Sequence, residues 1–112
     1  MSEVVFSIAR DFSRFPGPRF ARQGPHSGET LRRELKRQLS GLTGELVVDL
    51  DGTTGYGSSF LDEAFGGLVR SEHFPRDQLL AKLQFRSRLD PSYVDEILDS
   101  INKAEPELPA EH

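Results

Sequence analysis

The sequence predicts a small α/β domain, with a central mostly parallel or mixed β-sheet of about four strands and helices packed on it. Segments with the apolar spacing of strands alternate with segments that have helical spacing. The 112 residues are 36% hydrophobic and 29% charged, which suits one domain with a single core. We therefore expect one domain over residues 1–103, followed by an acidic, disordered tail over 104–112.

The first third of the chain is expected to supply a strand, a turn and a helix. Apolar residues indicate a strand near 3–12, and the Pro-Gly-Pro run within 15–20 indicates a turn. A short second strand near 19–22 is compatible with the pattern. Ser27 suits a helix N-cap, and leucines that recur every four residues predict a helix that ends at Gly41.

The middle of the chain is expected to form a buried strand and a helix. Residues 46–50 are apolar and β-branched, which is typical of a central strand buried on both faces. Apolar residues over 60–69 then repeat at helical spacing. Gly66 and Gly67 weaken that helix by about 1 kcal/mol each relative to Ala. Close packing on the sheet would be one reason to keep them.

The last third is expected to form a connection, a strand and a helix. Residues 71–79 are a connection that contains Pro75. Apolar and polar residues alternate over 81–89, which predicts a strand with one solvated face. Asp90-Pro91 is typical of an N-cap followed by proline at the first helical position, and it predicts a last helix.

Composition narrows the class of protein. The chain has no cysteine, so it has no disulfide and no thiolate metal site. No apolar run approaches the roughly 20 residues of a membrane span, and the N-terminus lacks the layout of a signal peptide. We therefore expect a cytoplasmic protein that does not contact the membrane. The basic residues lack an aromatic platform, which makes nucleic acid an unfavourable ligand.

The segment Asp49-Leu50-Asp51-Gly52-Thr53 resembles the nucleophile motif of haloacid-dehalogenase-like phosphohydrolases. The resemblance implies Asp49 as nucleophile, Asp51 as acid/base and Mg²⁺ as cofactor. Such enzymes also need a phosphate-anchoring lysine and a later acidic pair, whereas Lys82 lies in an alternating strand and Asp95-Glu96 lies in an amphipathic helix. We therefore expect no catalytic residue, no metal site and no cofactor, and we keep the Mg²⁺-dependent phosphohydrolase as the alternative.

A glycine-rich polar loop and the start of the following helix form the candidate binding site. A strand, such a loop and a helix start gather backbone N–H groups at one point, where a phosphate or a partner can bind. Ser58 or Ser59 is the expected N-cap of the helix. The expected partner- or anion-binding residues are Asp51, Gly52, Thr53, Thr54, Gly55, Tyr56, Gly57, Asp62 and Glu63.

Three arginines are candidates for contacts with an anion. Arg14, Arg19 and Arg22 precede the helix that begins at Ser27, where they could clamp a negatively charged group. A small nucleotide- or anion-binding sensor is therefore a further alternative function. The histidines are scattered without the spacing of metal ligands.

The segments Val47–Gly52 and Gly55–Val69 resemble a family of small bacterial STAS-like domains of unknown function. Ser27-Gly28-Glu29 and Leu31 fit the same pattern, and the resemblance covers most of residues 4–103. It implies the STAS-like α/β fold. Related STAS domains include anti-sigma factor antagonists, which present a serine at the start of the helix after the central strand.

In those antagonists, a partner kinase with a histidine-kinase-type ATPase fold phosphorylates this serine and so switches binding off. Ser58 and Ser59 occupy the matching place, so the resemblance implies that they are phosphorylation candidates. We expect a non-catalytic bacterial regulatory module that binds a protein partner through the 51–65 region. A phosphoserine there would add up to two negative charges beside Asp51, Asp62 and Glu63.

Overall fold

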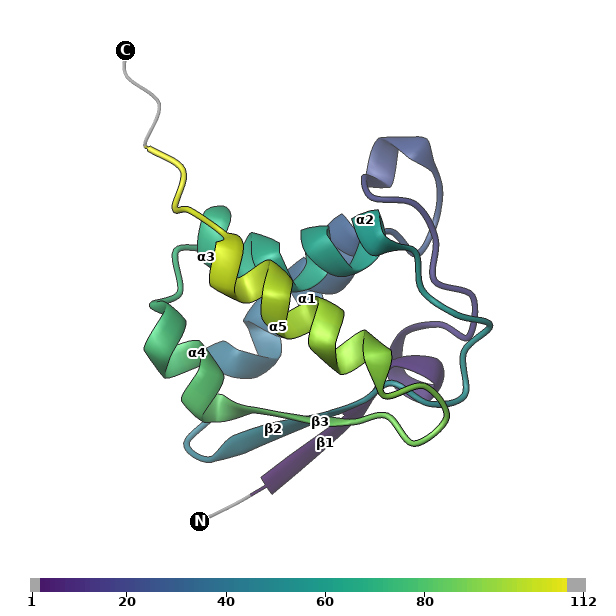
Figure 1. The fold of residues 1–112 in the computed structure, drawn as a ribbon, viewed down its shortest axis with the longest axis horizontal. Helices are drawn as coiled ribbons and strands as arrows, with labels where there is room; N and C mark the ends of the chain where they lie inside the picture. The colour runs from purple at the N-terminus through teal and green to yellow at the C-terminus, as the bar shows by residue number, and fades with distance from the viewer. Residues whose placement is uncertain (1–2, 109–112) are drawn as a thin grey trace.

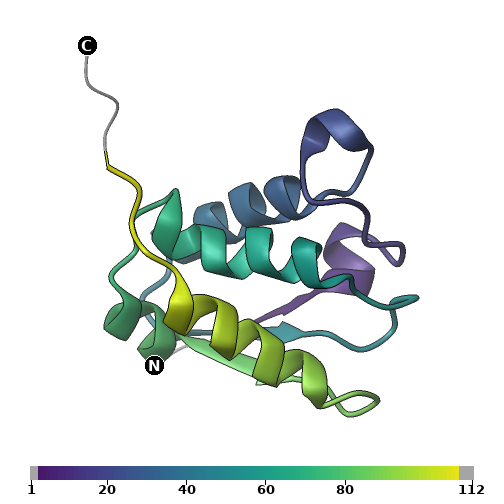
Figure 2. The same cartoon turned by 45° about the horizontal axis from the view of Figure 1, so that its top comes forward.

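The structure, a computed structural model, describes residues 3–108 and contains one three-stranded sheet with helices on one of its faces (Figures 1 and 2). All strand pairs are parallel, and β2 lies in the centre. The strands are β1 (Glu3–Ser7), β2 (Glu45–Asp49) and β3 (Leu83–Arg86). The α/β fold is confirmed, with three strands instead of about four.

The missing strand is the one expected near 19–22. This segment instead contains the short 3₁₀ helix η2 (Ala21–Gln23), which ends at Gly24. The side chain of Gln23 turns back and accepts a hydrogen bond from the Phe20 N–H at 3.0 Å. A side chain that satisfies the local backbone in this way favours a tight turn over pairing with a sheet.

The register of the sheet separates its two faces. Phe6, Val48 and Phe85 are neighbours across the three strands, and they point toward the helices together with Leu46. Val47 lies on the opposite face, because successive side chains of a strand alternate. It is only 6% exposed, so the central strand is buried on both faces as expected.

The first strand is shorter than the expected range of 3–12, because the chain turns after Ser7 into a π-helical turn, η1 (Ile8–Phe12). The Ser7 hydroxyl accepts a hydrogen bond from the Arg10 N–H at 3.2 Å. The Ser7 N–H in turn donates to the Asp11 carboxylate at 2.9 Å. These two bonds close the turn, and they place Ile8 in the core with no exposed surface.

Helix α1 (Gly28–Ser40) begins and ends where the sequence predicts. The Ser27 hydroxyl accepts a hydrogen bond from the Thr30 N–H at 3.0 Å, which makes Ser27 the N-cap. The leucine stripe faces the core and is almost fully buried. Its members are Leu31, Leu35 and Leu39.

A single helical segment runs from Ser58 to Arg70 and packs between α1 and α5. It consists of α2 (Ser58–Leu61), a π-helical turn η3 (Asp62–Gly66) and α3 (Gly67–Arg70). The backbone keeps right-handed helical angles through both junctions. Its apolar side chains are completely buried, as the spacing predicts; they include Phe60, Ala64, Phe65 and Leu68.

The two glycines of this helix face other helices and not the sheet, which corrects the expected reason for them. A Cβ on Gly66 would lie 3.2 Å from the Ser100 carbonyl oxygen of α5. A Cβ on Gly67 would lie only 2.7 Å from Cδ of Arg32 in α1. The glycines therefore permit close helix–helix packing.

The C-terminal third contains one helix that the sequence interpretation missed. Helix α4 (Arg76–Lys82) occupies part of the expected connection, and β3 is correspondingly shorter than 81–89. The last helix, α5 (Ser92–Lys103), follows as expected, but it begins one residue later than predicted, with Pro91 instead of Asp90 at the N-cap position. Asp90 Oδ1 accepts a hydrogen bond from the Ser92 N–H at 3.1 Å.

Part of the expected tail is held against the domain. The Glu107 N–H donates to the Arg70 carbonyl at 2.8 Å, and Ala104 is buried. The rest of the expected tail, residues 109–112, lies outside the described part of the chain. Among residues 3–108, every helix is too short or too polar to cross a bilayer.

Candidate functional site

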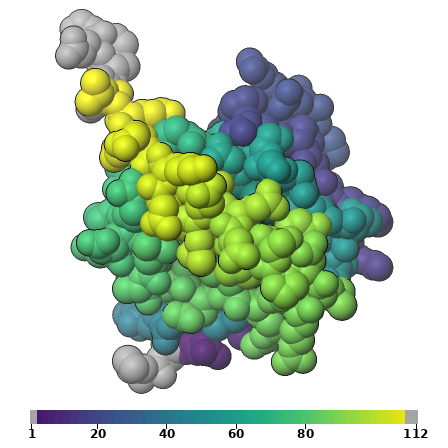
Figure 3. Space-filling view, in the orientation of Figure 1, coloured from purple at the N-terminus to yellow at the C-terminus, as the bar shows by residue number. Residues whose placement is uncertain are grey.

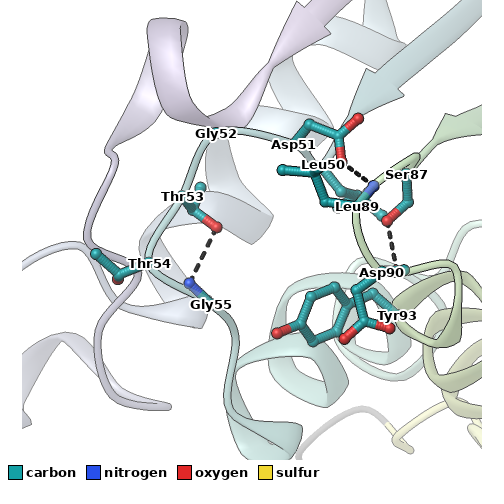
Figure 4. Close-up of a pocket in the computed structure, with 10 residues that line it drawn as sticks. All are labelled: Leu50, Asp51, Gly52, Thr53, Thr54, Gly55, Ser87, Leu89, Asp90 and Tyr93. Atoms are coloured by element: carbon teal, nitrogen blue, oxygen red, sulfur yellow. Dashed lines mark hydrogen bonds between the residues drawn. The ribbon is translucent and has the colours of Figure 1, made fainter.

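The loop after β2 lies at the carboxyl ends of the parallel strands, where ligand sites of such sheets usually form. It borders a small hollow of about 140 Å³, shown in Figure 4. Backbone and side chains from the segment after β3 and from the start of α5 form the other wall. The lining residues are Leu50, Asp51, Gly52, Thr53, Thr54, Gly55, Ser87, Leu89, Asp90 and Tyr93.

The two carboxylates of the phosphatase-like motif hold this loop in place. Asp49 Oδ1 accepts a hydrogen bond from the Asp51 N–H at 3.0 Å. The two oxygens of Asp51 accept from the N–H groups of Arg88 and Leu89 at 2.9 and 3.0 Å. The Leu89 and Arg88 N–H groups lower the pKa of Asp51. Asp51 thus ties the loop after β2 to the segment after β3.

Two tyrosines clamp the middle of the loop. The Tyr56 hydroxyl donates to the Leu50 carbonyl at 2.7 Å, and burial raises the pKa of Tyr56 to about 12. The rings of Tyr56 and Tyr93 meet edge to face at 4.9 Å, and the Tyr56 N–H donates to the Tyr93 hydroxyl at 3.4 Å. Sequence reasoning missed Tyr93. The sequence does place Tyr93 in the first turn of the helix after β3. That turn starts at the carboxyl end of the sheet, where the loop after β2 also lies, so Tyr93 could have been predicted to contact the loop.

The serines open the Ser58–Arg70 helix but do not cap it. Gly57 occupies the N-cap position without any side-chain cap, so the expectation that Ser58 or Ser59 caps the helix is wrong. Both serines lie in its first turn and are exposed. The Ser58 hydroxyl donates to Glu96 Oε1 of α5 at 2.9 Å. Ser59 makes no side-chain hydrogen bond to the described residues.

Asp62 and Glu63 belong to a partly buried network of charged side chains. Glu63 is only 5% exposed and binds Arg32 of α1 and Arg19. Asp62 binds Arg19 at 2.8 Å and Arg70 at 3.4 Å. The carboxylate of Glu63 is thus engaged with arginines of the chain itself, and its contact with a partner stays a prediction. Burial of this charge is tolerated because it is paired.

Arg32 is the central residue of this network that sequence reasoning missed. It occupies a position that looks like the solvated face of α1, yet its side chain is 11% exposed. Its guanidinium also donates to Glu72 at 2.9 Å. No local pattern marks it, because its carboxylate partners follow 31 and 40 residues later.

Comparison with known families identifies the fold family. A family model described as a STAS-like domain of unknown function (DUF4325) matches residues 27–92, which is more than half of the chain. The protein belongs to this STAS-like family. The matched range includes α1, β2, the loop, both serines and β3. Neither the search of curated proteins nor that of solved structures found a significant match.

The three candidate anion-binding arginines of this STAS-like domain have different surroundings. Arg19 is engaged with Asp62 and Glu63. Arg22 is exposed, and its guanidinium lies 5.2 Å from the ring centre of Phe20. Arg14 is exposed, and its carbonyl accepts a hydrogen bond from the Thr54 N–H at 2.9 Å.

Among residues 3–108 of the STAS-like domain, no three His, Asp or Glu side chains gather in a way that could hold a metal ion. The described carboxylates of the loop face backbone N–H groups instead. The site that the residues do form is a braced polar loop with two exposed serines at its end.

Proposed function

We propose that this STAS-like domain is a non-catalytic regulatory module that binds a protein partner through the 51–59 loop and helix start. Phosphorylation of Ser59 or Ser58 would weaken that binding. The observation that carries the proposal is the exposure of both serines at the start of a helix whose apolar side chains are otherwise buried. A kinase can reach them, and a change there alters the surface with little effect on the core.

The surroundings of the two serines suggest different consequences for phosphorylation. A phosphate on Ser59 would lie in the first turn of the helix, where the helix dipole favours negative charge. A phosphate on Ser58 would replace a hydrogen bond to Glu96 with repulsion between two anions. Ser59 is therefore the better candidate for a switch that leaves the fold intact. Modification of Ser58 would also loosen the contact with α5.

The contacts of Asp49 and Asp51 support the non-catalytic part of the proposal. A general acid must carry a proton near neutral pH, but backbone N–H donors lower the pKa of Asp51. Asp49 is hydrogen-bonded to the backbone of the same loop and lies 3.7 Å from a guanidinium nitrogen of Arg86. Both carboxylates thus have a role in bracing the loop.

The experiment uses the tagged full chain, expressed in its native host and purified with its bound proteins. Mass spectrometry then identifies the partner and any phosphoserine. We propose that one such partner is a kinase with a histidine-kinase-type ATPase fold, as the family resemblance implies. Affinity for the purified partner is measured for Ser58→Ala, Ser59→Ala, Ser58→Asp and Ser59→Asp. Ser40→Asp, at an exposed serine on α1, is the control.

We expect Ser59→Asp to weaken partner binding severalfold while it unfolds at nearly the wild-type temperature. Ser58→Asp should weaken binding and also lower thermal stability, and Glu96→Gln should restore part of that stability. Equal affinity for all folded serine variants would contradict the switch. A wild-type chain that retains no partner would contradict the interaction itself. Mg²⁺-dependent hydrolysis of p-nitrophenyl phosphate that disappears in Asp49→Asn would contradict the non-catalytic reading.

A further inference from the structure

Two large apolar side chains are exposed at the edge of the molecule that carries the braced loop. Phe15 is 64% exposed and follows β1 and η1, whereas Leu89 is 82% exposed and follows β3. Because the strands are parallel, both segments leave the sheet at its carboxyl end. In Figure 3, the surfaces of the segment after β1, the loop after β2 and the segment after β3 adjoin on one side.

Both side chains extend from backbone that is tied to the loop between them. The Thr54 N–H donates to the carbonyl of Arg14, directly before Phe15, at 2.9 Å. The Leu89 N–H donates to Asp51 Oδ1 at 3.0 Å. Apolar side chains on a fixed backbone lose little freedom when a partner covers them, which favours their use as binding anchors.

A basic side chain directly precedes each of these two anchors, and the acidic Asp90 follows Leu89. Arg14 and Arg88 directly precede Phe15 and Leu89, and both are exposed. Neither forms an ion pair with a carboxylate in the described residues 3–108. Asp51 and Asp90 accept hydrogen bonds from nearby backbone N–H groups and keep their negative charge beside the segment after β3. Each anchor therefore has beside it an exposed guanidinium that forms no ion pair with a described carboxylate.

We propose that Phe15 and Leu89 are the apolar anchors for the partner, with Arg14 and Arg88 pairing with acids on it. The occupant is a protein surface that presents apolar pockets rimmed by carboxylates. The inference rests on the proposed function. It also explains why phosphorylation of the serines would weaken partner binding and not strengthen it. A phosphate at the end of the same loop would repel an acidic partner, whereas it would attract a basic one.

The test uses the full chain and the partner that co-purifies with the wild type. The site variants are Phe15→Ala, Leu89→Ala, Arg14→Glu and Arg88→Glu. Leu108→Ala is the control for loss of an exposed apolar side chain, because Leu108 is 91% exposed and follows α5. Arg33→Glu, on the exposed face of α1, is the control for charge reversal. Dissociation constants are measured at low and high salt, and circular dichroism checks the fold.

We expect each site variant to weaken binding about tenfold or more, and each control to bind like the wild type. Added salt should weaken wild-type binding, and it should affect Arg14→Glu and Arg88→Glu less. Wild-type affinity in all site variants would overturn the assignment of the anchors and leave the proposed function standing. A wild type without any partner would overturn both. Self-association of the wild type that Phe15→Ala abolishes would make a second copy the occupant and overturn the acidic partner.

Discussion

At the residue scale, Asp51 is the clearest case of a side chain whose surroundings decide its role. In the sequence it follows an apolar strand in a phosphohydrolase-like motif, where a carboxylate could serve as an acid or base. In the fold it accepts hydrogen bonds from two N–H groups of the segment after β3. Those donors favour the ionised form, so the carboxylate braces the loop.

The contribution of Asp51 to stability should depend on pH. The pKa of Asp51 is lower in the folded protein than in the unfolded chain, where it is about 3.9. The ionised carboxylate therefore stabilises the fold fully at pH values above about 3.9. This stabilisation is lost as the pH falls through the folded pKa. We expect Asp51→Asn to be about 1 kcal/mol less stable than the wild type at pH 7, since solvent screens this partly exposed group.

The measurement is urea unfolding of both proteins between about pH 7 and pH 2. The difference in unfolding free energy should shrink below about pH 4. Glu105→Gln, which neutralises an exposed carboxylate outside the loop, is the control. A difference between wild type and Asp51→Asn that stays constant over this range would show that the charge of Asp51 does not brace the loop.

At the element scale, the Ser58–Arg70 helix is shaped by what packs against it. Its middle is a π-helical turn, and its two glycines let α1 and α5 approach closely. Glu63 projects from the same turn and pairs with Arg32 of α1. Arg32 cannot move aside freely, because it also binds Glu72. The charge network and the small residues therefore fix one arrangement of the two helices.

Gly67→Ala should destabilise the protein even though alanine favours helix formation. The new Cβ would lie 2.7 Å from Arg32 Cδ, so the pinned arginine or the helix must shift. Such overpacking costs about 1–3 kcal/mol. Replacement of Gly by Ala in a helix gains only about 1 kcal/mol, so most of the range of overpacking costs leaves a net loss of stability. Urea unfolding should thus give a lower midpoint for Gly67→Ala than for the wild type.

Gly41→Ala is the matched control, because a Cβ at Gly41 would meet no atom within 4 Å. Its stability should stay close to that of the wild type. If Gly67→Ala instead unfolded at a higher urea concentration than the wild type, the space beside Arg32 would be larger than the contacts indicate.

At the scale of the whole molecule, the sheet has a free edge at β1, because the strand order is β1-β2-β3. A free edge can pair with another chain unless it is protected. Here the π-helical turn η1 places two charged side chains against that edge. Arg10 donates to the Val5 carbonyl at 3.4 Å, and Asp11 accepts from the Ser7 N–H at 2.9 Å. The two side chains also bind each other at 2.8 Å.

Removal of this pair should promote self-association through β1. We expect Arg10→Ala/Asp11→Ala to stay folded but to form dimers or larger species at protein concentrations where the wild type forms fewer. Sedimentation equilibrium over a range of concentrations measures the change. Glu29→Ala/Arg33→Ala, which removes an ion pair on the surface of α1, is the control. Identical mass distributions for all three proteins would show that the edge needs no protection.

The sequence by itself determined the fold class, the boundaries of α1, and the burial of β2 and of the apolar stripe in the Ser58–Arg70 helix. These features follow from local spacing, since the period of the apolar residues specifies both the type of element and the face that turns inward. Ser27 capped α1 as expected because an N-cap bond reaches only three residues along the chain. The same local rule was wrong for the Ser58–Arg70 helix. It placed the N-cap at one of the two serines, whereas Gly57 occupies that position.

Only the tertiary structure decided the roles of the charged and polar side chains. Asp51 meets residues 88 and 89, Arg32 meets Glu63, and Ser58 meets Glu96, all across more than 30 positions of sequence. The exposure of Phe15 and Leu89 together with Arg14 and Arg88 likewise depends on three separate segments that meet at one edge of the sheet. A polar side chain has several possible partners along the chain, and packing of the apolar core selects which one comes within reach of a hydrogen bond.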